Sequence, residues 1–134
     1  MVPSVTAQER CDIEALVYEH AWLIDTRASE RLAELYTENG RLIGSNGINL
    51  NCQNPEEIAA YGRRAAQRVN VTARHVVTNI RLVKLDENRI QGNMMIGLCR
   101  SDLPLGDPTP IAMADANDIY VRGDDGRWRI EERR

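Results

Sequence analysis

Apolar residues recur at helical spacing over the first part of the chain. Between residues 13 and 24 they share one face of a helix, the face that packs against a core. Thr6 and Glu9 stand three residues apart just before this pattern, so each side chain can bond a free backbone N–H at the helix start. The pattern predicts a first helix from Thr6, with the inward side chains Ile13, Leu16, Val17, Ala21 and Ile24.

A second, shorter helix is predicted after the first. Its inward side chains are Leu32, Leu35 and Tyr36, and we expect Asn39-Gly40 to end it because both residues tolerate a positive φ. Residues 41–45 form a predicted short strand. The polar, Asn-rich stretch at 45–54 predicts a loop or an edge hairpin.

A third helix has clear start signals. Asn54 can cap it, Pro55 suits its first position, and Glu57 follows three residues after the cap. Its predicted inward face holds Ile58, Tyr61 and Ala65.

From Thr72 onward the apolar period changes to two, which is typical of strands. We expect a long strand with Val76, Ile80 and Leu82 on one face, and His75, Val77, Asn79 and Val83 on the other. Asp86 to Asn88 makes a turn into a second long strand at 89–101, with Ile90, Met94, Ile96 and Leu98 on one side.

The last part of the chain predicts two more strands. LPLGDPTP at 103–110 is a loop, and the strand at 111–121 carries Ile111, Met113, Asp115, Asn117 and Ile119 on one face. A turn at 124–126 leads into the ending WRIEERR, which we expect to be a solvated edge strand whose charges oppose edge-to-edge pairing.

Helices first and strands later indicate an α+β fold rather than alternating βαβ units. The 134 residues fit a single domain, 1–134, with about three helices packed on one face of a strongly curved, mainly antiparallel sheet. A bent sheet covered by helices leaves a cavity between the layers, where small-molecule sites tend to form.

Composition narrows the classes of partner. The net charge is −3 and the pI about 5.4, which argues against a nucleic-acid partner because phosphate binding needs a basic face. No apolar run has the length of a signal peptide or a membrane span, so we expect a cytoplasmic protein without a membrane partner. Cys11, Cys52 and Cys99 are odd in number and lack CxxC spacing, which favours reduced thiols.

Two histidines and one aspartate carry the candidate chemistry. His75 lies in the middle of a strand, His20 lies on the apolar stripe of the first helix, and Asp25 stands at the end of that helix, on the side of Tyr18 and Trp22. An imidazole can take a proton near neutral pH, and a carboxylate bonded to its other nitrogen fixes the tautomer and stabilises the imidazolium. An Asp at a helix end and a His on a facing strand can meet in this way.

Structural explanations compete with this one. Asp25 could cap the second helix, and His75 could be a core histidine bonded to a backbone carbonyl. Arg100 and Asp115 could face the same cavity or form an ion pair. No phosphate loop, GxSxG elbow, HExxH or clustered His/Cys set is present, so we expect no cofactor and no metal.

Three stretches, in their order and spacing, resemble SnoaL-like proteins of the nuclear-transport-factor-2-like (NTF2-like) superfamily. They are YEHAWLIDTRASERLAELYTENGRL, ARHVVTNIRL and ANDIYVRGDDGRWRIEERR, and with the capped third helix they cover nearly the whole chain. The resemblance implies a cone-shaped fold. The superfamily includes scytalone dehydratase, dehydrochlorinases, ketosteroid isomerase, polyketide cyclases and non-catalytic binding modules, so the fold leaves the activity open.

In the dehydratase branch of that superfamily, a helix-end Asp and a strand His abstract a proton together. Asp25 and His75 match those positions, and His20 stands five residues before the Asp, where the branch often has Lys or Tyr. The resemblance thus implies a lyase with catalytic Asp25, His75 and His20. We expect the substrate to be bound by Tyr18, Trp22, Tyr36, Leu98, Arg100, Met113 and Asp115.

Other activities stay open under this resemblance. The same dyad could serve an isomerase or a polyketide cyclase, and the cavity could belong to a non-catalytic ligand-binding or assembly module. Limonene epoxide hydrolase uses an Arg flanked by two Asp residues, and Arg100-Ser101-Asp102 with Asp115 is a loose echo of it. We expect a small hydrophobic substrate and a homodimer or homotrimer.

Overall fold

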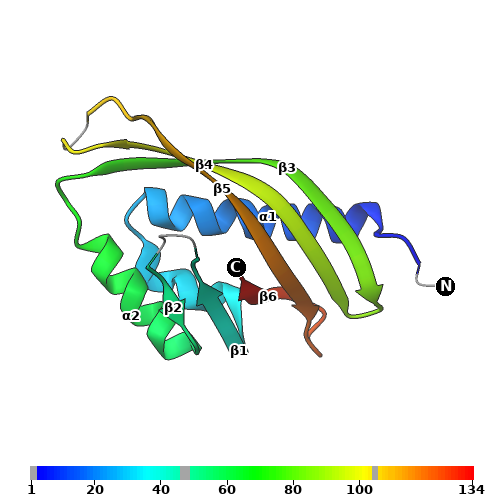
Figure 1. Ribbon diagram of the computed structural model, residues 1–134. Coiled ribbons are helices and arrows are strands. Elements are labelled where there is room, and N and C mark those ends of the chain that lie inside the picture. The colour runs from blue at the N-terminus through cyan, green and yellow to red at the C-terminus, as the bar shows by residue number, and fades with distance from the viewer. Residues whose placement is uncertain (1–2, 46–48, 104–105) are drawn as a thin grey trace.

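The computed structural model describes residues 3–45, 49–103 and 106–134, and it contains three helices and six strands. Helix α1 comes first in the chain and is followed by the 3₁₀ helix η1 (Figure 1). Helix α2 comes after the first two strands and before the other four. The elements are α1 Ala7–Asp25, η1 Ser29–Leu35, β1 Tyr36–Ile43, β2 Asn51–Cys52, α2 Pro55–Ala66, β3 Thr72–Asp86, β4 Arg89–Ser101, β5 Thr109–Arg122 and β6 Trp128–Arg133.

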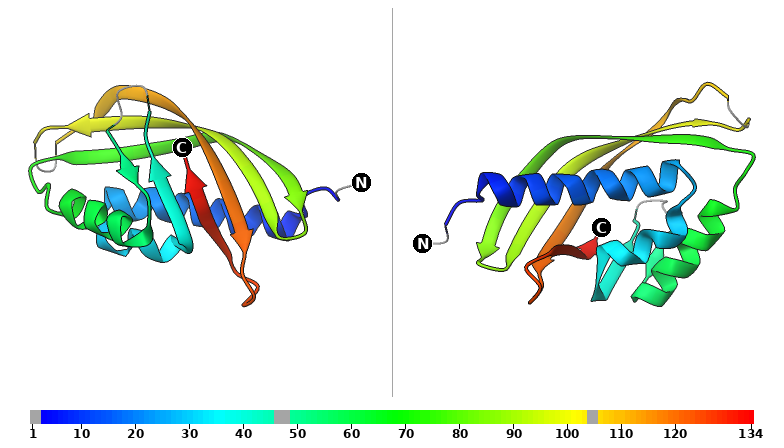
Figure 2. Two further views of the ribbon diagram at one scale, coloured as in Figure 1. Left: turned by 60° about the horizontal axis from the view of Figure 1, so that its bottom comes forward. Right: turned by 180° about the vertical axis from the view of Figure 1, so that it is seen from behind.

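The six strands form one curled sheet in the order β2-β1-β6-β5-β4-β3. All neighbours are antiparallel except β1 and β6, which run parallel, so the sheet is mixed and does not close into a barrel. The two views in Figure 2 show α1 lying along the hollow side of the sheet, with η1 and α2 at one end. This architecture confirms the predicted α+β class and the curved sheet covered by helices.

The predicted capping box holds the start of α1. The Thr6 side chain accepts the Glu9 N–H at 3.1 Å, and the Glu9 carboxylate accepts the Thr6 N–H at 2.9 Å. Glu9 also accepts a hydrogen bond from Lys84 of β3 at 2.8 Å, which fastens this end of the helix to the sheet. Ile13 and Val17 are fully buried against the core, as their spacing predicts.

The second helix is shorter than predicted. It ends at Leu35, and Tyr36 is the first residue of β1 instead of an inward residue of the helix. Asn39-Gly40 lies inside β1, where the pairing with β6 shifts register. A Cβ on Gly40 would lie 2.6 Å from the Cβ of Tyr36, so glycine serves a close approach within the strand and not a helix end. The expected edge hairpin exists as β1 with β2, and residues 46–48 of its loop lie outside the described residues.

Strand β3 changes face in its middle. Asn79 has a φ of +57°, and the pairing with β4 shifts between Thr78 and Arg81. This bulge inserts an extra residue, so Val77 before it and Ile80 after it both pack against the core. The prediction that Val76 shares a face with Ile80 is therefore wrong, and Val76 is 56% exposed on the outer face.

The last strand is not an edge strand. β6 lies between β1 and β5, and the described edges of the sheet are β2 and β3. Arg133 of β6 is only 8% exposed, and its guanidinium bonds the fully buried Asp118 of β5 at 2.6 and 2.8 Å. Tyr120 also donates a hydrogen bond to that carboxylate, at 2.7 Å. The prediction of a solvated edge strand is wrong because β6 lies inside the sheet and its Arg133 is buried in an ion pair with Asp118.

None of the helices in the described part of the chain combines the length and the apolar character needed to cross a bilayer.

Replacing Arg133 by Ala should lower the free energy of unfolding by about 3–5 kcal/mol, because Asp118 would stay buried without its cation. Arg134→Ala is the matched control, since that side chain is 54% exposed, and we expect a change within about 0.5 kcal/mol. Urea denaturation measures both. Equal losses for the two variants would contradict the importance of the buried pair.

Candidate active site

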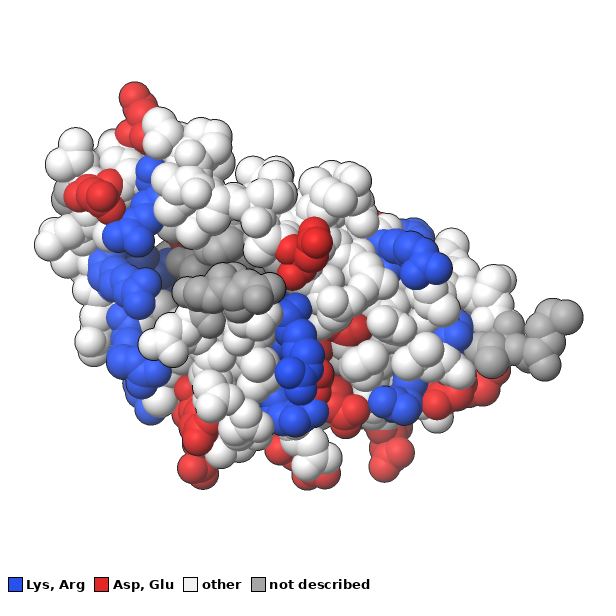
Figure 3. All heavy atoms as spheres, viewed as in Figure 1, with Lys and Arg blue, Asp and Glu red and all other residues white. Residues whose placement is uncertain are grey.

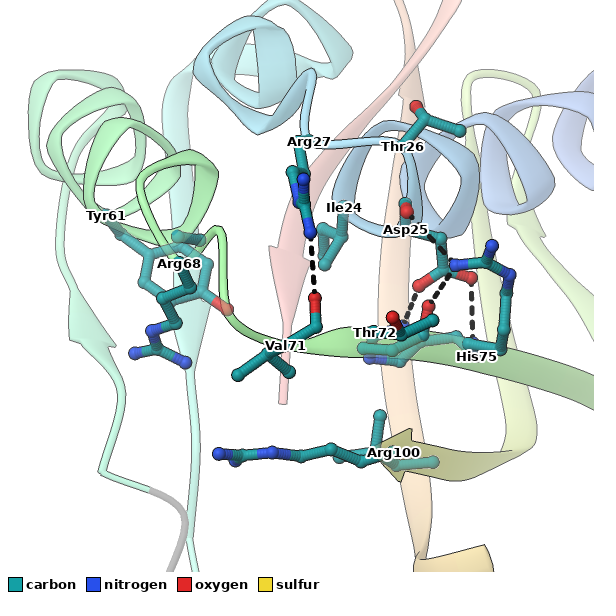
Figure 4. Close-up of a pocket in the computed structure, with 14 residues that line it drawn as sticks. Ile24, Asp25, Thr26, Arg27, Tyr61, Arg68, Val71, Thr72, His75 and Arg100 are labelled. Carbon is teal, nitrogen blue, oxygen red and sulfur yellow. Dashed lines mark hydrogen bonds and ion pairs between the residues drawn. The ribbon is translucent and has the colours of Figure 1, made fainter. Parts of the chain in front are cut away.

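Asp25 and His75 meet at the point where α1 ends against β3. The carboxylate Oδ1 lies 2.6 Å from the ring Nδ1 of His75, and Oδ2 accepts the backbone N–H of the same residue at 2.8 Å (Figure 4). Their side chains are 10% and 22% exposed, respectively. The two contacts fix both the carboxylate and the ring plane.

This geometry decides between the alternatives left open by the sequence. Asp25 does not cap η1, whose N-cap is Ala28 without a side-chain hydrogen bond. His75 bonds a carboxylate and not a backbone carbonyl. A carboxylate can only accept, so in the neutral form of the ring the hydrogen is on Nδ1 and the lone pair is on Nε2. Among the described residues Nε2 has no hydrogen-bond partner, and it is thus the nitrogen available to a ligand.

Two arginines hold the end of α1 to the start of β3. Arg27, whose φ is +62°, donates to the carbonyls of Val69 and Val71 at 2.9 and 3.1 Å. Arg74 donates to the backbone carbonyl of Asp25 at 3.3 Å. These bonds join the two segments that carry the dyad, so the short Asp25–His75 contact does not depend on the pair alone.

Two cavities adjoin at His75. The smaller, of about 310 Å³, lies at the end of α1, and the larger, of about 620 Å³, lies between α1 and the sheet. Four residues line both: Ile24, Tyr61, His75 and Leu98. The imidazole therefore lies where a molecule extending from one cavity into the other would pass.

His20 lies in the wall of the larger cavity. It is 4% exposed, and its Nε2 is 2.9 Å from the Tyr36 hydroxyl. Burial lowers the pKa of His20 well below 6.5, and the positive charge of Arg133 and the ring of His75 lower it further. Burial also raises the pKa of Tyr36 far above its ordinary value. Both groups are therefore neutral near pH 7 and act as hydrogen-bonding partners.

The structure brings together only some of the predicted substrate-binding residues. Tyr36 bonds His20, Leu98 lines both cavities, and Arg100 lines the smaller one. Tyr18 and Trp22 line neither cavity and lie on the surface of α1, 50% and 64% exposed.

Met113 and Asp115 border the larger cavity from an exposed position on β5. The side chain of Met113 is 69% exposed, and Asp115 is also exposed. Arg100 pairs with Asp102 at 3.0 Å and makes no ion pair with Asp115. Arg100, Asp102 and Asp115 thus do not form the single cluster that an epoxide hydrolase would need. Within the described ranges, no three His, Cys, Asp or Glu side chains gather as a metal site.

Several site residues were not anticipated from the sequence. Arg27, Arg68 and Arg74 line the smaller cavity, and Arg133 lines the larger one. Their spacing gave no signal, because they come from two connections and two strands that meet only in the folded chain. A positive φ at Arg27 is equally invisible in the sequence.

Comparison with known proteins identifies a family. The family described as the SnoaL-like domain matches residues 5–134. Among proteins with curated descriptions, none matches the chain.

Solved structures share the fold. One from Catenulispora acidiphila, in complex with S-DNPA, is 19% identical with a TM-score of 0.80, covering 96% of this chain and 92% of that one. A scytalone dehydratase-like protein from Novosphingobium aromaticivorans is 17% identical with a TM-score of 0.76, covering 93% and 80%. An NTF2-like protein with a cystatin-like fold from the same species is 19% identical with a TM-score of 0.72, covering 94% and 79%. These likenesses confirm the expected fold.

The neutral state of His20 predicts a pH dependence of stability. Below about pH 6.5 His20 binds a proton in the unfolded chain but stays neutral in the folded protein. The free energy of unfolding therefore falls as the pH drops. Between about pH 7.5 and 5.5 this should remove about 1 kcal/mol from the free energy of unfolding. His20→Gln should lose that part of the dependence in urea titrations, whereas His75→Gln should keep it. An unchanged pH dependence in His20→Gln would refute the assignment.

Proposed function

Because the chain belongs to the SnoaL-like domain family, we propose that it is a cofactor-free lyase of the dehydratase type. Its substrate is a small, largely hydrophobic organic molecule. One observation carries the proposal: His75 lines both cavities and is held by Asp25 through Nδ1 at 2.6 Å, while Nε2 has no hydrogen-bond partner among the described residues. The scytalone dehydratase-like protein with the same fold supports the reaction class.

Each group has a defined part in the reaction. Nε2 of His75 removes a proton from carbon, and Asp25 stabilises the imidazolium that forms. The electron pair of the broken C–H bond makes the new C=C bond, and the neighbouring C–O bond breaks. His20 holds the departing oxygen by a hydrogen bond, and the imidazolium returns its proton so that water leaves. His75 is then neutral again, and no other reactant is consumed.

The same first step would serve an isomerase or a polyketide cyclase, in which the carbanion is reprotonated elsewhere or attacks a carbonyl. Product identification separates these outcomes from elimination. A binding module without catalysis would need the cavities but not the ordered dyad. The bidentate use of the Asp25 carboxylate on His75 is the specific observation that favours catalysis.

Proton abstraction can be measured before the natural substrate is known. A panel of cyclic ketones and hydroxy ketones in D₂O should include compounds whose acidic C–H exchanges in the presence of the protein, as seen by ¹H NMR. His75→Ala and Asp25→Asn should each slow that exchange by about 10²–10⁴-fold, because the base or its orienting carboxylate is lost.

Asp12→Asn is the matched control for this experiment. Asp12 lies on the same helix as Asp25 and is exposed, and among the described residues its carboxylate accepts a hydrogen bond only from the Gln8 side chain, at 2.8 Å. The control should exchange at the wild-type rate. Full activity in both dyad variants would end the proposal of catalysis by this pair.

We also propose that the protein is a cytoplasmic homo-oligomer assembled through the outer face of the sheet. Three unpaired cysteines fit a reducing compartment. On the outer face, Gly97 pairs with both Val76 and Met113, and the Met113 side chain lies over it. Ile111, Met95, Val76 and Met113 are 42–69% exposed there, an apolar surface that a second copy would cover.

Met113→Asp should shift the protein toward monomer in sedimentation equilibrium, because a charge would be buried in the contact. Val69→Asp changes a side chain that is 55% exposed but lies away from that strand pair, and it should leave the mass unchanged. A wild-type protein that is monomeric at all concentrations would contradict the assembly.

A further inference from the structure

The smaller cavity has an unusual charge for this chain. The protein as a whole carries a net charge of −3, yet four arginines line this one cavity. They are Arg27, Arg68, Arg74 and Arg100, and the carboxylate that lines the cavity with them is Asp25, which is already bonded to His75. Figure 3 shows positive side chains gathered over the end of the molecule where α2 and the tips of β3 and β4 lie.

The four guanidinium groups are not equally engaged. Arg27 and Arg74 donate to backbone carbonyls and hold the cavity wall. Arg100 pairs with Asp102, a side chain that is 82% exposed, so water competes for that contact. The Arg68 guanidinium makes no hydrogen bond or ion pair with any described residue, and only the backbone N–H of Arg68 is bonded, to the Ala65 carbonyl. Arg68 is thus free to bind a ligand, and Arg100 can exchange its exposed partner Asp102 for one. Figure 4 shows both side chains extending to the same side of the cavity.

The cavity next to it is mostly apolar and about twice as large. Its charged lining residues are Arg133, which is paired with Asp118, and the exposed Asp115 and Arg134. Its apolar walls include Leu42, Ile43, Val77, Ile96 and Ala116. The two cavities meet at His75. A ligand that fills both must be charged and negative at one end and apolar at the other.

We propose that the substrate is an apolar carboxylic acid. Its carboxylate binds Arg68 and Arg100, since the planar guanidinium matches a carboxylate through paired hydrogen bonds. Its apolar body occupies the larger cavity, and the carbon that loses a proton lies between the two, at Nε2 of His75. This inference rests on the proposed function for the reaction itself and adds the class of substrate and the residues that select it.

The arrangement also explains how an acidic protein would attract an anion. Positive charge concentrated at a cavity mouth raises the local concentration of anionic ligands, and this effect weakens as salt is added. His20, which lines the larger cavity, is neutral and meets the uncharged part of the ligand. Charge therefore sets the direction in which the molecule enters.

The test is binding, which needs no turnover. The probes are 1-naphthylacetic, cyclohexylacetic and decanoic acids, each compared with its own primary amide by isothermal titration calorimetry. At least one acid should bind about tenfold more tightly than its amide, because a charge-assisted hydrogen bond is stronger than a neutral one. Added NaCl should weaken binding of the acid and not of the amide.

Variants locate the contact. Arg68→Gln and Arg100→Gln should each reduce the preference for the acid about tenfold and leave binding of the amide unchanged. Arg63→Gln is the matched control and should keep the preference, because Arg63 is exposed on the neighbouring α2 but does not line the cavity.

Two results would overturn the proposal. One is the absence of any acid preference, including no binding by either series. The other is a loss of acid preference in Arg63→Gln that equals the loss in Arg68→Gln and Arg100→Gln. His75→Ala should still bind the acids, so a failure of the dyad in catalysis and a failure of the carboxylate site give different results.

Discussion

The contact between Asp25 and His75 joins the helical layer to the sheet, and the proposed reaction depends on it. The carboxylate bonds the ring and the backbone of the same residue, so it sets the position of the strand and the orientation of the imidazole together. Arg27 and Arg74 fasten the neighbouring backbone on both sides of the contact. A base oriented in this way needs no rearrangement before it accepts a proton.

Burial divides the remaining polar groups into two kinds. His20 and Tyr36 are buried and neutral, and they can offer hydrogen bonds but no charge. Asp118 and Arg133 are buried as a charged pair that satisfies itself. The larger cavity has a mostly apolar wall, in which Arg133 is paired with Asp118 and Asp115 and Arg134 stand at exposed positions. The smaller cavity beside it is rich in cations. Such a division favours a molecule with one apolar end and one charged end.

Much of this could be predicted from the sequence where the signal is local. The capping box at Thr6 and the helical stripe with Ile13 and Val17 are properties of neighbouring residues, and the structure has them. The meeting of Asp25 with His75 could be expected from the helix end, the strand and the resemblance together. Its catalytic role remains a prediction.

The features that sequence reasoning missed depend on contacts between distant segments. The bulge at Asn79 cannot be seen in an alternating pattern, because one extra residue reverses every later side chain. Arg133 belongs to an Arg-rich ending, and only the position of β6 inside the sheet places it on Asp118. Tyr36 has helical spacing from Leu32, yet its pairing with β6 makes it the start of a strand. In each case a tertiary contact overrides the local preference.

The most direct measurement of the central claim is the state of the two ring nitrogens of His75, read by ¹H–¹⁵N NMR through the long-range couplings of the imidazole. At a pH where the ring is neutral, the account predicts a hydrogen on Nδ1 and a lone pair on Nε2, with the two forms mixing in Asp25→Asn. A hydrogen found on Nε2 in the wild-type protein, or a spectrum unchanged by Asp25→Asn, would contradict it.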